Sequence, residues 1–175
     1  AATLSAGPSI RTAIVGLLSD VSLESARRLA ESTYSRIVER LDLSDRRRTD
    51  EQIDSLLRAR PDLILLAGGT DGGASRSALK MLDTIGLACF LMPSEKRPAF
   101  LFAGNANLSE DVKGLMEGLT PNLHLSPNVR PSLEIEDLDP AMKDLAQANI
   151  AIRRKQINGV EELEGWSHGH ILPTS

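Results

Sequence analysis

An uninterrupted apolar run followed by a cluster of glycines is the feature that most constrains the fold of this chain. Residues 62–67 read Asp-Leu-Ile-Leu-Leu-Ala, and residues 68–73 read Gly-Gly-Thr-Asp-Gly-Gly. A short apolar run without polar alternation is typical of a strand buried on both faces of a parallel sheet. Glycines directly behind it permit a sharp turn into a helix. We therefore expect a central strand of an α/β sheet here.

The same alternation of strand and helix extends along most of the chain. Short apolar runs predict further strands at residues 12–18, 36–41, 98–104 and 122–125. Apolar residues at helical spacing predict helices at residues 22–30, 49–57, 78–85, 109–117 and 139–157. Thr49 with Gln52 resembles a capping box that begins the second helix, and Gly86 is expected to end the third.

Strands that alternate with helices predict right-handed crossovers and hence a parallel sheet. The fold class is a single three-layer α/β domain with about five mainly parallel strands, flavodoxin-like or Rossmann-like, and we expect the strand order 2-1-3-4-5. Residues 1–158 are expected to form this domain, and residues 159–175 a linker and the start of the next segment of a longer parent protein. The chain begins without Met and ends where an apolar run has just begun at Ile171, which indicates an internal fragment.

Charge and composition disfavour two classes of partner. The net charge is -4, and the basic run Arg46 to Arg48 lies beside Asp45, Asp50 and Glu51, which indicates a solvated loop. Nucleic acid and anionic membrane surfaces both require clustered Lys and Arg, so neither is an expected partner. No stretch approaches the roughly 20 apolar residues of a membrane span. The single Cys89 fits a reducing compartment, and we expect a cytoplasmic protein.

Polar and glycine residues follow each predicted strand. Ligands of open α/β sheets bind at the carboxyl ends of the strands, and those ends meet at one edge of the sheet. The candidate ligand-binding or partner-binding residues at that edge are Asp20, Gly68, Gly69, Thr70, Asp71, Gly72, Gly73, Asn105 and Asn128.

Each of these candidates also has a purely structural interpretation. The amides of Gly68 to Gly73 could hold an anion, or Asp71 could cap the following helix or fill the amide nest itself. Asn105 and Asn128 could contact a ligand, although bracing of the loops is the favoured role. Asp20 could bind a cation, although capping a helix start is favoured. We expect at least one glycine of the turn to adopt a backbone conformation closed to alanine.

The sequence contains no complete catalytic or metal-binding pattern. His168 and His170 lack cysteine or carboxylate partners at defined spacing, and His124 is predicted to be a satisfied core or edge histidine. Cys89 lies in an apolar stretch that disfavours a reactive thiolate. The Gly68–Gly73 segment also lacks the Gly-Lys-Ser/Thr ending of a Walker loop. We therefore assign no catalytic residue, no metal and no cofactor to this fragment.

The order of five segments resembles the glutamate mutase MutL family, which is unrelated to the mismatch-repair protein of the same name. The segments are Ser5 to Gly7, Ile14 to Leu17, Pro61 to Gly73, Ala103 to Asn105 and Asn128 to Pro131. The most specific is Leu-Leu-Ala-Gly-Gly-Thr-Asp-Gly-Gly at residues 65–73. At Gly7-Pro8-Ser9 the chain departs from the family's pattern.

The resemblance implies an accessory protein linked to adenosylcobalamin-dependent glutamate mutase, within the actin-like, Hsp70-like ATPase superfamily. Both phosphate loops of that superfamily are missing here, so ATP and Mg²⁺ are implied for the parent protein and not for this fragment. We expect an internal regulatory or interaction domain whose partners are the other domains of the parent and a cobalamin-dependent mutase. The alternative is a small-molecule-binding or anion-binding domain that uses the Gly68–Gly73 edge.

Overall fold

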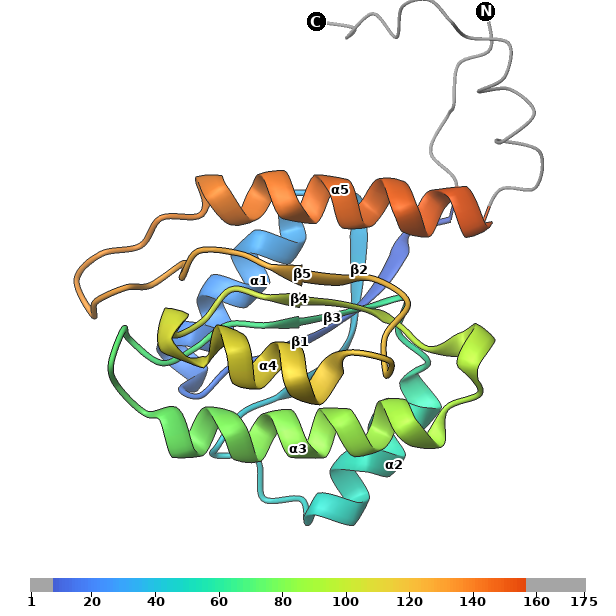
Figure 1. The fold of residues 1–175 in the computed structure, drawn as a ribbon, viewed down its shortest axis with the longest axis horizontal. Coiled ribbons are helices and arrows are strands. Elements are labelled where there is room, and N and C mark those ends of the chain that lie inside the picture. The colour runs from blue at the N-terminus through green and yellow to red at the C-terminus, as the bar shows by residue number, and fades with distance from the viewer. Residues whose placement is uncertain (1–7, 157–175) are drawn as a thin grey trace, which may run out of the picture.

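The computed structural model describes residues 8–156 as one sheet of five parallel strands with helices on both faces (Figure 1). The strands are β1 (Ile10–Val15), β2 (Ser35–Leu41), β3 (Leu63–Leu66), β4 (Ala99–Phe102) and β5 (Leu123–Leu125). Their order is β2-β1-β3-β4-β5, which confirms the predicted topology and places β3 at the centre.

Two groups of helices cover the sheet, one on each face. The cluster on one face contains α1 (Glu24–Glu31) and α5 (Asp139–Gln156). The cluster on the other contains α2 (Thr49–Ala59), α3 (Ser75–Leu91) and α4 (Ser109–Met116). Three short helical segments lie in the connections, η1 (Ser19–Leu23), η2 (Ser94–Lys96) and η3 (Ala106–Leu108). The result is the predicted three-layer arrangement, with α5 on one side of the sheet and α3 and α4 on the other (Figure 1).

The two central strands form the most buried part of the domain. Every residue of β3 and β4 is buried, because helices pack on both faces of the sheet at this point. Side chains alternate between the two faces, so Ile64 and Phe100 join one core cluster while Leu65 and Leu101 join the other. Full burial of a side chain of this size contributes about 1.5–3 kcal/mol.

The N-cap of α2 and the end of α3 differ from the prediction. α3 continues through Gly86 to Leu91, because Ala88 and Cys89 are fully buried against the core and their packing offsets the low helix propensity of one glycine. α2 is preceded by Arg48 as its N-cap, and the carboxylate of Glu51 accepts a hydrogen bond from the Arg48 amide at 2.7 Å. Only the Glu51 half of a capping box is therefore present, because the arginine side chain has no acceptor, and the N-cap lies one residue before Thr49.

The predicted boundary at residue 158 and the linker 159–175 lie outside the described residues, as do His168 and His170. None of the helices between residues 8 and 156 combines the length and the apolar character that crossing a membrane would need.

Candidate functional site

The carboxyl ends of the strands meet at one edge of the sheet, where the loops after β3, β4 and β5 contact one another (Figure 1). The structure brings Asp71, Asn105 and Asn128 together there through hydrogen bonds around the Gly68–Gly73 turn. Thr70 is half-buried in the same turn, and its carbonyl accepts from the amide of Gly73 at 2.8 Å.

Asn105 holds the turn in place with all of its hydrogen-bonding capacity. Its side chain is fully buried. Nδ2 donates to the carbonyl of Gly73 at 2.8 Å and to Ser75 Oγ at 3.3 Å. Oδ1 accepts from the amides of Gly72 at 3.2 Å and Asn107 at 3.1 Å. These four contacts use both donors and both acceptor positions of the amide, so its role in this structure is to brace two loops.

Asn128 and Asp71 form the second half of the network. Asn128 Nδ2 donates to the carbonyl of Gly69 and to Asp71 Oδ1, both at 2.9 Å. Asp71 Oδ1 also accepts from the amide of Ala106 at 3.0 Å. The carboxylate and the amide therefore join the loops after β3, β4 and β5 at a single point.

The role predicted for Asp71 at the following helix is wrong. The N-cap of α3 is Ala74, at φ 46°, and no side chain caps it. Asp71 instead serves the loop before α4, because the tight turn directs its carboxylate toward the neighbouring strand's connection and away from its own helix. A contact with a residue 35 positions away has no local signature in the sequence.

The glycines adopt conformations that other residues rarely enter. Gly69 has φ 76°, Gly72 has φ 79° and Gly68 has φ 148°, which confirms the prediction that the turn contains positions closed to alanine. At Gly68 a side chain would also meet Leu17 Cγ at 2.9 Å. The turn therefore needs glycine both for its backbone and for its close approach to the loop after β1.

Three consecutive amides of the turn donate hydrogen bonds within the domain. The Asp71 amide donates to the Pro131 carbonyl at 3.1 Å, the Gly72 amide donates to Asn105, and the Gly73 amide donates to Thr70. An anion held here would need those donors. The observed geometry consequently matches a self-contained turn better than an anion-binding nest.

Asp20 does not take the capping role that was favoured for it. The Oγ atom of Ser22 accepts from the amides of Leu17 at 2.8 Å and Leu18 at 3.0 Å. The side chain that satisfies the start of this segment is therefore the hydroxyl of Ser22, which lies within η1 and reaches back to the amides that precede it. Asp20 is exposed and lines a hollow with Leu18 and Leu43.

Large apolar side chains are exposed at the same edge of the sheet. Leu18 is 54% exposed, Leu43 46%, Leu133 62% and Ile135 56%. Leu18 and Leu43 belong to the connections after β1 and β2, and Leu133 and Ile135 to the loop between β5 and α5. We call these four side chains the rim surface. The sequence does not indicate these side chains as a surface, because leucines and isoleucines in loops carry no periodic signal.

An ionic cluster fixes the loop between β5 and α5 against α1. Glu136 pairs with Arg28 at 2.9 Å and with Arg130 at 3.1 Å, and it also accepts from Ser25 Oγ. Partial burial alone would raise the pKa of Glu136, but the Ser25 hydrogen bond and the two guanidinium groups outweigh it and lower that pKa. Leu133 and Ile135 are therefore presented by an anchored loop.

Metal-binding and nucleophilic chemistry have no assembled site in the part of the chain that the structure describes. Residues 8–156 contain no group of three or more His, Cys, Asp and Glu side chains placed to hold a metal ion. His124 lies on the edge strand β5, and the prediction of a satisfied histidine is wrong, because its Nε2 is buried without a partner among the described residues. Burial lowers the pKa of His124, and Asp144 opposes that shift.

Cys89 is expected to be unreactive in the folded protein. It is fully buried, and burial raises the pKa of its thiol to about 12 from an ordinary value of 9.0. Because the unfolded thiol ionises first, the free energy of unfolding should fall as the pH rises above 9.0. Thiol titration with a disulfide reagent should show negligible labelling at pH 8 and full labelling in urea; rapid labelling of the folded protein would contradict burial.

Comparisons with known proteins place the chain in a family. The sequence model described as MutL protein matches residues 1–175. Protein MutL of Clostridium tetanomorphum is 26% identical over 173 residues, which cover 97% of this chain and 35% of that protein. The chain thus spans about a third of the length of this curated relative.

One solved structure that matches this chain is the signal receiver domain of a protein assigned as a Luxo repressor from Vibrio parahaemolyticus. It has a TM-score of 0.47 and 13% identity, over 93% of this chain and 99% of that one.

The family model's match over all 175 residues confirms the resemblance drawn from the Leu65–Gly73 segment, and this chain belongs to the glutamate mutase MutL family.

Proposed function

We propose that this domain is the interaction module of a MutL accessory protein, and that its rim surface contacts glutamate mutase. The observation that carries the proposal is the arrangement at the carboxyl edge. The turn donates its amides internally, and the loops after β1, β2 and β5 at the same edge carry the exposed side chains of Leu18, Leu43, Leu133 and Ile135. Apolar side chains grouped on one edge are typical of a surface that another protein covers.

The alternative role, a small-molecule or anion site built on Gly68–Gly73, has weaker support. Such a ligand would have to displace the Pro131 carbonyl from Asp71 and the Asn105 side chain from Gly72. Asn105 and Asn128 would also have to give up hydrogen bonds to the turn. Each exchange costs the ligand part of its binding free energy.

The same proposal includes a nucleotide-binding role for other parts of the parent protein. ATP and Mg²⁺ are proposed to bind outside this domain, because the phosphate loops of an actin-like ATPase are not in this sequence. The domain would then pass the state of the nucleotide site on to the mutase through the rim surface. The other domains of the parent are the second proposed partner.

Binding to purified glutamate mutase tests the proposal. The pair Leu133→Ser and Ile135→Ser should weaken binding of the MutL protein by at least about tenfold, since one buried anchor side chain contributes about 2 kcal/mol to an interface. Biolayer interferometry with immobilised mutase measures the dissociation constant.

Ile150→Ser is the matched control, because Ile150 is 55% exposed on α5 and Ile135 is 56% exposed on the rim surface. The control variant should bind like the unmodified protein. Equal binding by the rim variant, or equal weakening by both, would reject the rim surface as the contact.

A further inference from the structure

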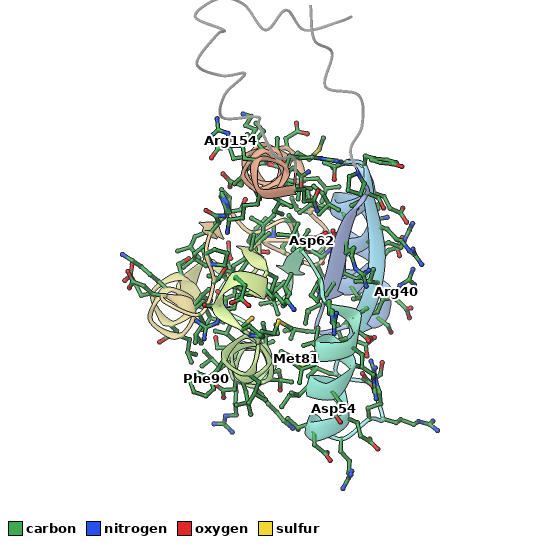
Figure 2. All side chains as sticks on the ribbon, turned by 90° about the vertical axis from the view of Figure 1, so that its right-hand side faces the viewer. Arg40, Asp54, Asp62, Met81, Phe90 and Arg154 are labelled. Atoms are coloured by element: carbon green, nitrogen blue, oxygen red, sulfur yellow. The ribbon has the colours of Figure 1, made fainter. Side chains whose placement is uncertain are left out.

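A pocket lies at the amino ends of the strands, on the side of the sheet opposite to the rim surface. Its volume is about 310 Å³. Its lining comes from the ends of α2 and α5 and from the segments before β3, β4 and β5, including Arg60, Asp62, Glu95, Lys96, Arg97 and Lys155. Figure 2 views the molecule from this side, and Asp62 lies between Arg154 on α5 and Asp54 on α2.

The lining of this pocket is positively charged in a protein that is acidic overall. Four of the lining residues are cations, Arg60, Lys96, Arg97 and Lys155, and two are carboxylates. The chain as a whole has a net charge of -4. Cations gathered in a concave site raise the local potential and favour an anionic ligand.

These four cations have no carboxylate partners within the described part of the chain. Ion pairs there involve Arg27, Arg28, Arg47, Arg48 and Arg130. Asp62 is the nearest carboxylate by sequence to Arg60, but its Oδ2 accepts from the backbone amide of Arg11 at 2.9 Å. Asp62 and Glu95 offset two of the four positive charges, so the lining keeps an excess of two cations.

Arg97 is positioned by neutral groups. Its Nη1 donates to the carbonyl of Gly118 at 2.8 Å and its Nε donates to that of Met92 at 3.4 Å. These contacts orient the guanidinium and leave its charge available. A guanidinium has further N–H donors, and its planar geometry matches phosphate oxygens.

Arg60 occupies a backbone conformation that glycine commonly adopts at the end of a helix. It ends α2 with φ 42° and ψ 61°, the left-handed region in which glycine is the common residue. A further polar group is also unused at the pocket, because Gln156 Oε1 is buried without a partner among the described residues.

We propose that this pocket binds a small phosphate-bearing ligand through Arg60, Lys96, Arg97 and Lys155. The volume of about 310 Å³ is at the lower limit of small-molecule sites, which fits a compact phosphate compound. A hydroxyl group on such a ligand would satisfy Gln156. The site is separate from the rim surface, so the interaction proposal can fail without affecting it.

Isothermal titration of the chain with inorganic pyrophosphate tests the proposal. Saturable binding with a stoichiometry of one is expected, and it should weaken at high salt. Arg60→Gly and Lys155→Gln should each lose at least about tenfold in affinity, the factor that one charge-assisted hydrogen bond supplies. Because glycine suits φ 42°, Arg60→Gly should keep or raise the melting temperature, so its loss of binding cannot come from unfolding.

Arg46→Gln is the matched control, since Arg46 is an exposed cation outside the pocket lining. It should bind pyrophosphate within about twofold of the unmodified chain. An equal loss in this control would show diffuse charge attraction and overturn the proposal. Absence of saturable binding, or tighter binding of succinate than of pyrophosphate, would also overturn it.

Discussion

Replacing Gly104 by alanine is expected to lower the free energy of unfolding by about 3 kcal/mol or more, because the change overpacks a fully buried junction. A β-carbon at this position would lie 2.5 Å from the Gly68 carbonyl oxygen and 3.0 Å from Phe102 Cε2. The carbonyl cannot move freely, since it accepts from the Asn105 amide at 3.2 Å. The strain therefore falls on the point where the loops after β3 and β4 meet.

Gly114→Ala is the control with the opposite sign. Gly114 lies within α4, and an added β-carbon would find nothing within 4 Å. Alanine there should raise the free energy of unfolding by about 0.5–1 kcal/mol through helix propensity. Urea unfolding of both variants measures the difference, and a Gly104→Ala protein as stable as the unmodified chain would show that the two loops are not in contact.

The order of the sheet could be predicted because its strongest signals lie in its centre. The β3 and β4 runs are apolar throughout, since helices cover both of their faces. β5 has a weaker signal, because it contains only three residues and none of them is fully buried. Alternation with helices then determined the parallel topology, while the ends of several elements were misplaced, as in β1, which was expected at residues 12–18 and runs from Ile10 to Val15.

The sequence pattern predicted which residues form the candidate site, but it did not predict the hydrogen bonds between them. In a parallel sheet the residues that follow the strands lie at one edge, so the sequence pattern predicted that Gly68–Gly73, Asn105 and Asn128 are neighbours. The pairing of Asp71 with Ala106 and Asn128 depends on the spacing of β3, β4 and β5 in the sheet. That spacing depends on the fold, and local rules favoured the adjacent helix instead.

The basic pocket escaped prediction for a related reason. Its four cations come from residues 60, 96, 97 and 155, which belong to three distant segments. In the sequence Lys155 belongs to a second basic run, Arg153 to Lys155, and Arg60, Lys96 and Arg97 each lie within two residues of a carboxylate, so nothing local indicates that the four converge. In the folded domain Arg47 and Arg48 form ion pairs with carboxylates. The four pocket cations, in contrast, lie together and have no ion-pair partner among the described residues.

Asn105→Ala is expected to lower the free energy of unfolding by about 3 kcal/mol, since it removes four hydrogen bonds from a fully buried side chain. The amides of Gly72 and Asn107 and the Gly73 carbonyl would lose their partner, and a cavity would form beside them. Asn107→Ala is the control, because its side chain is exposed, and it should change stability by no more than about 0.5 kcal/mol. Urea unfolding gives both values, and amide hydrogen exchange at Gly72 should accelerate in the first variant alone. A loss below about 1 kcal/mol for Asn105→Ala would mean that the turn keeps its shape without this side chain, and that water can replace the brace.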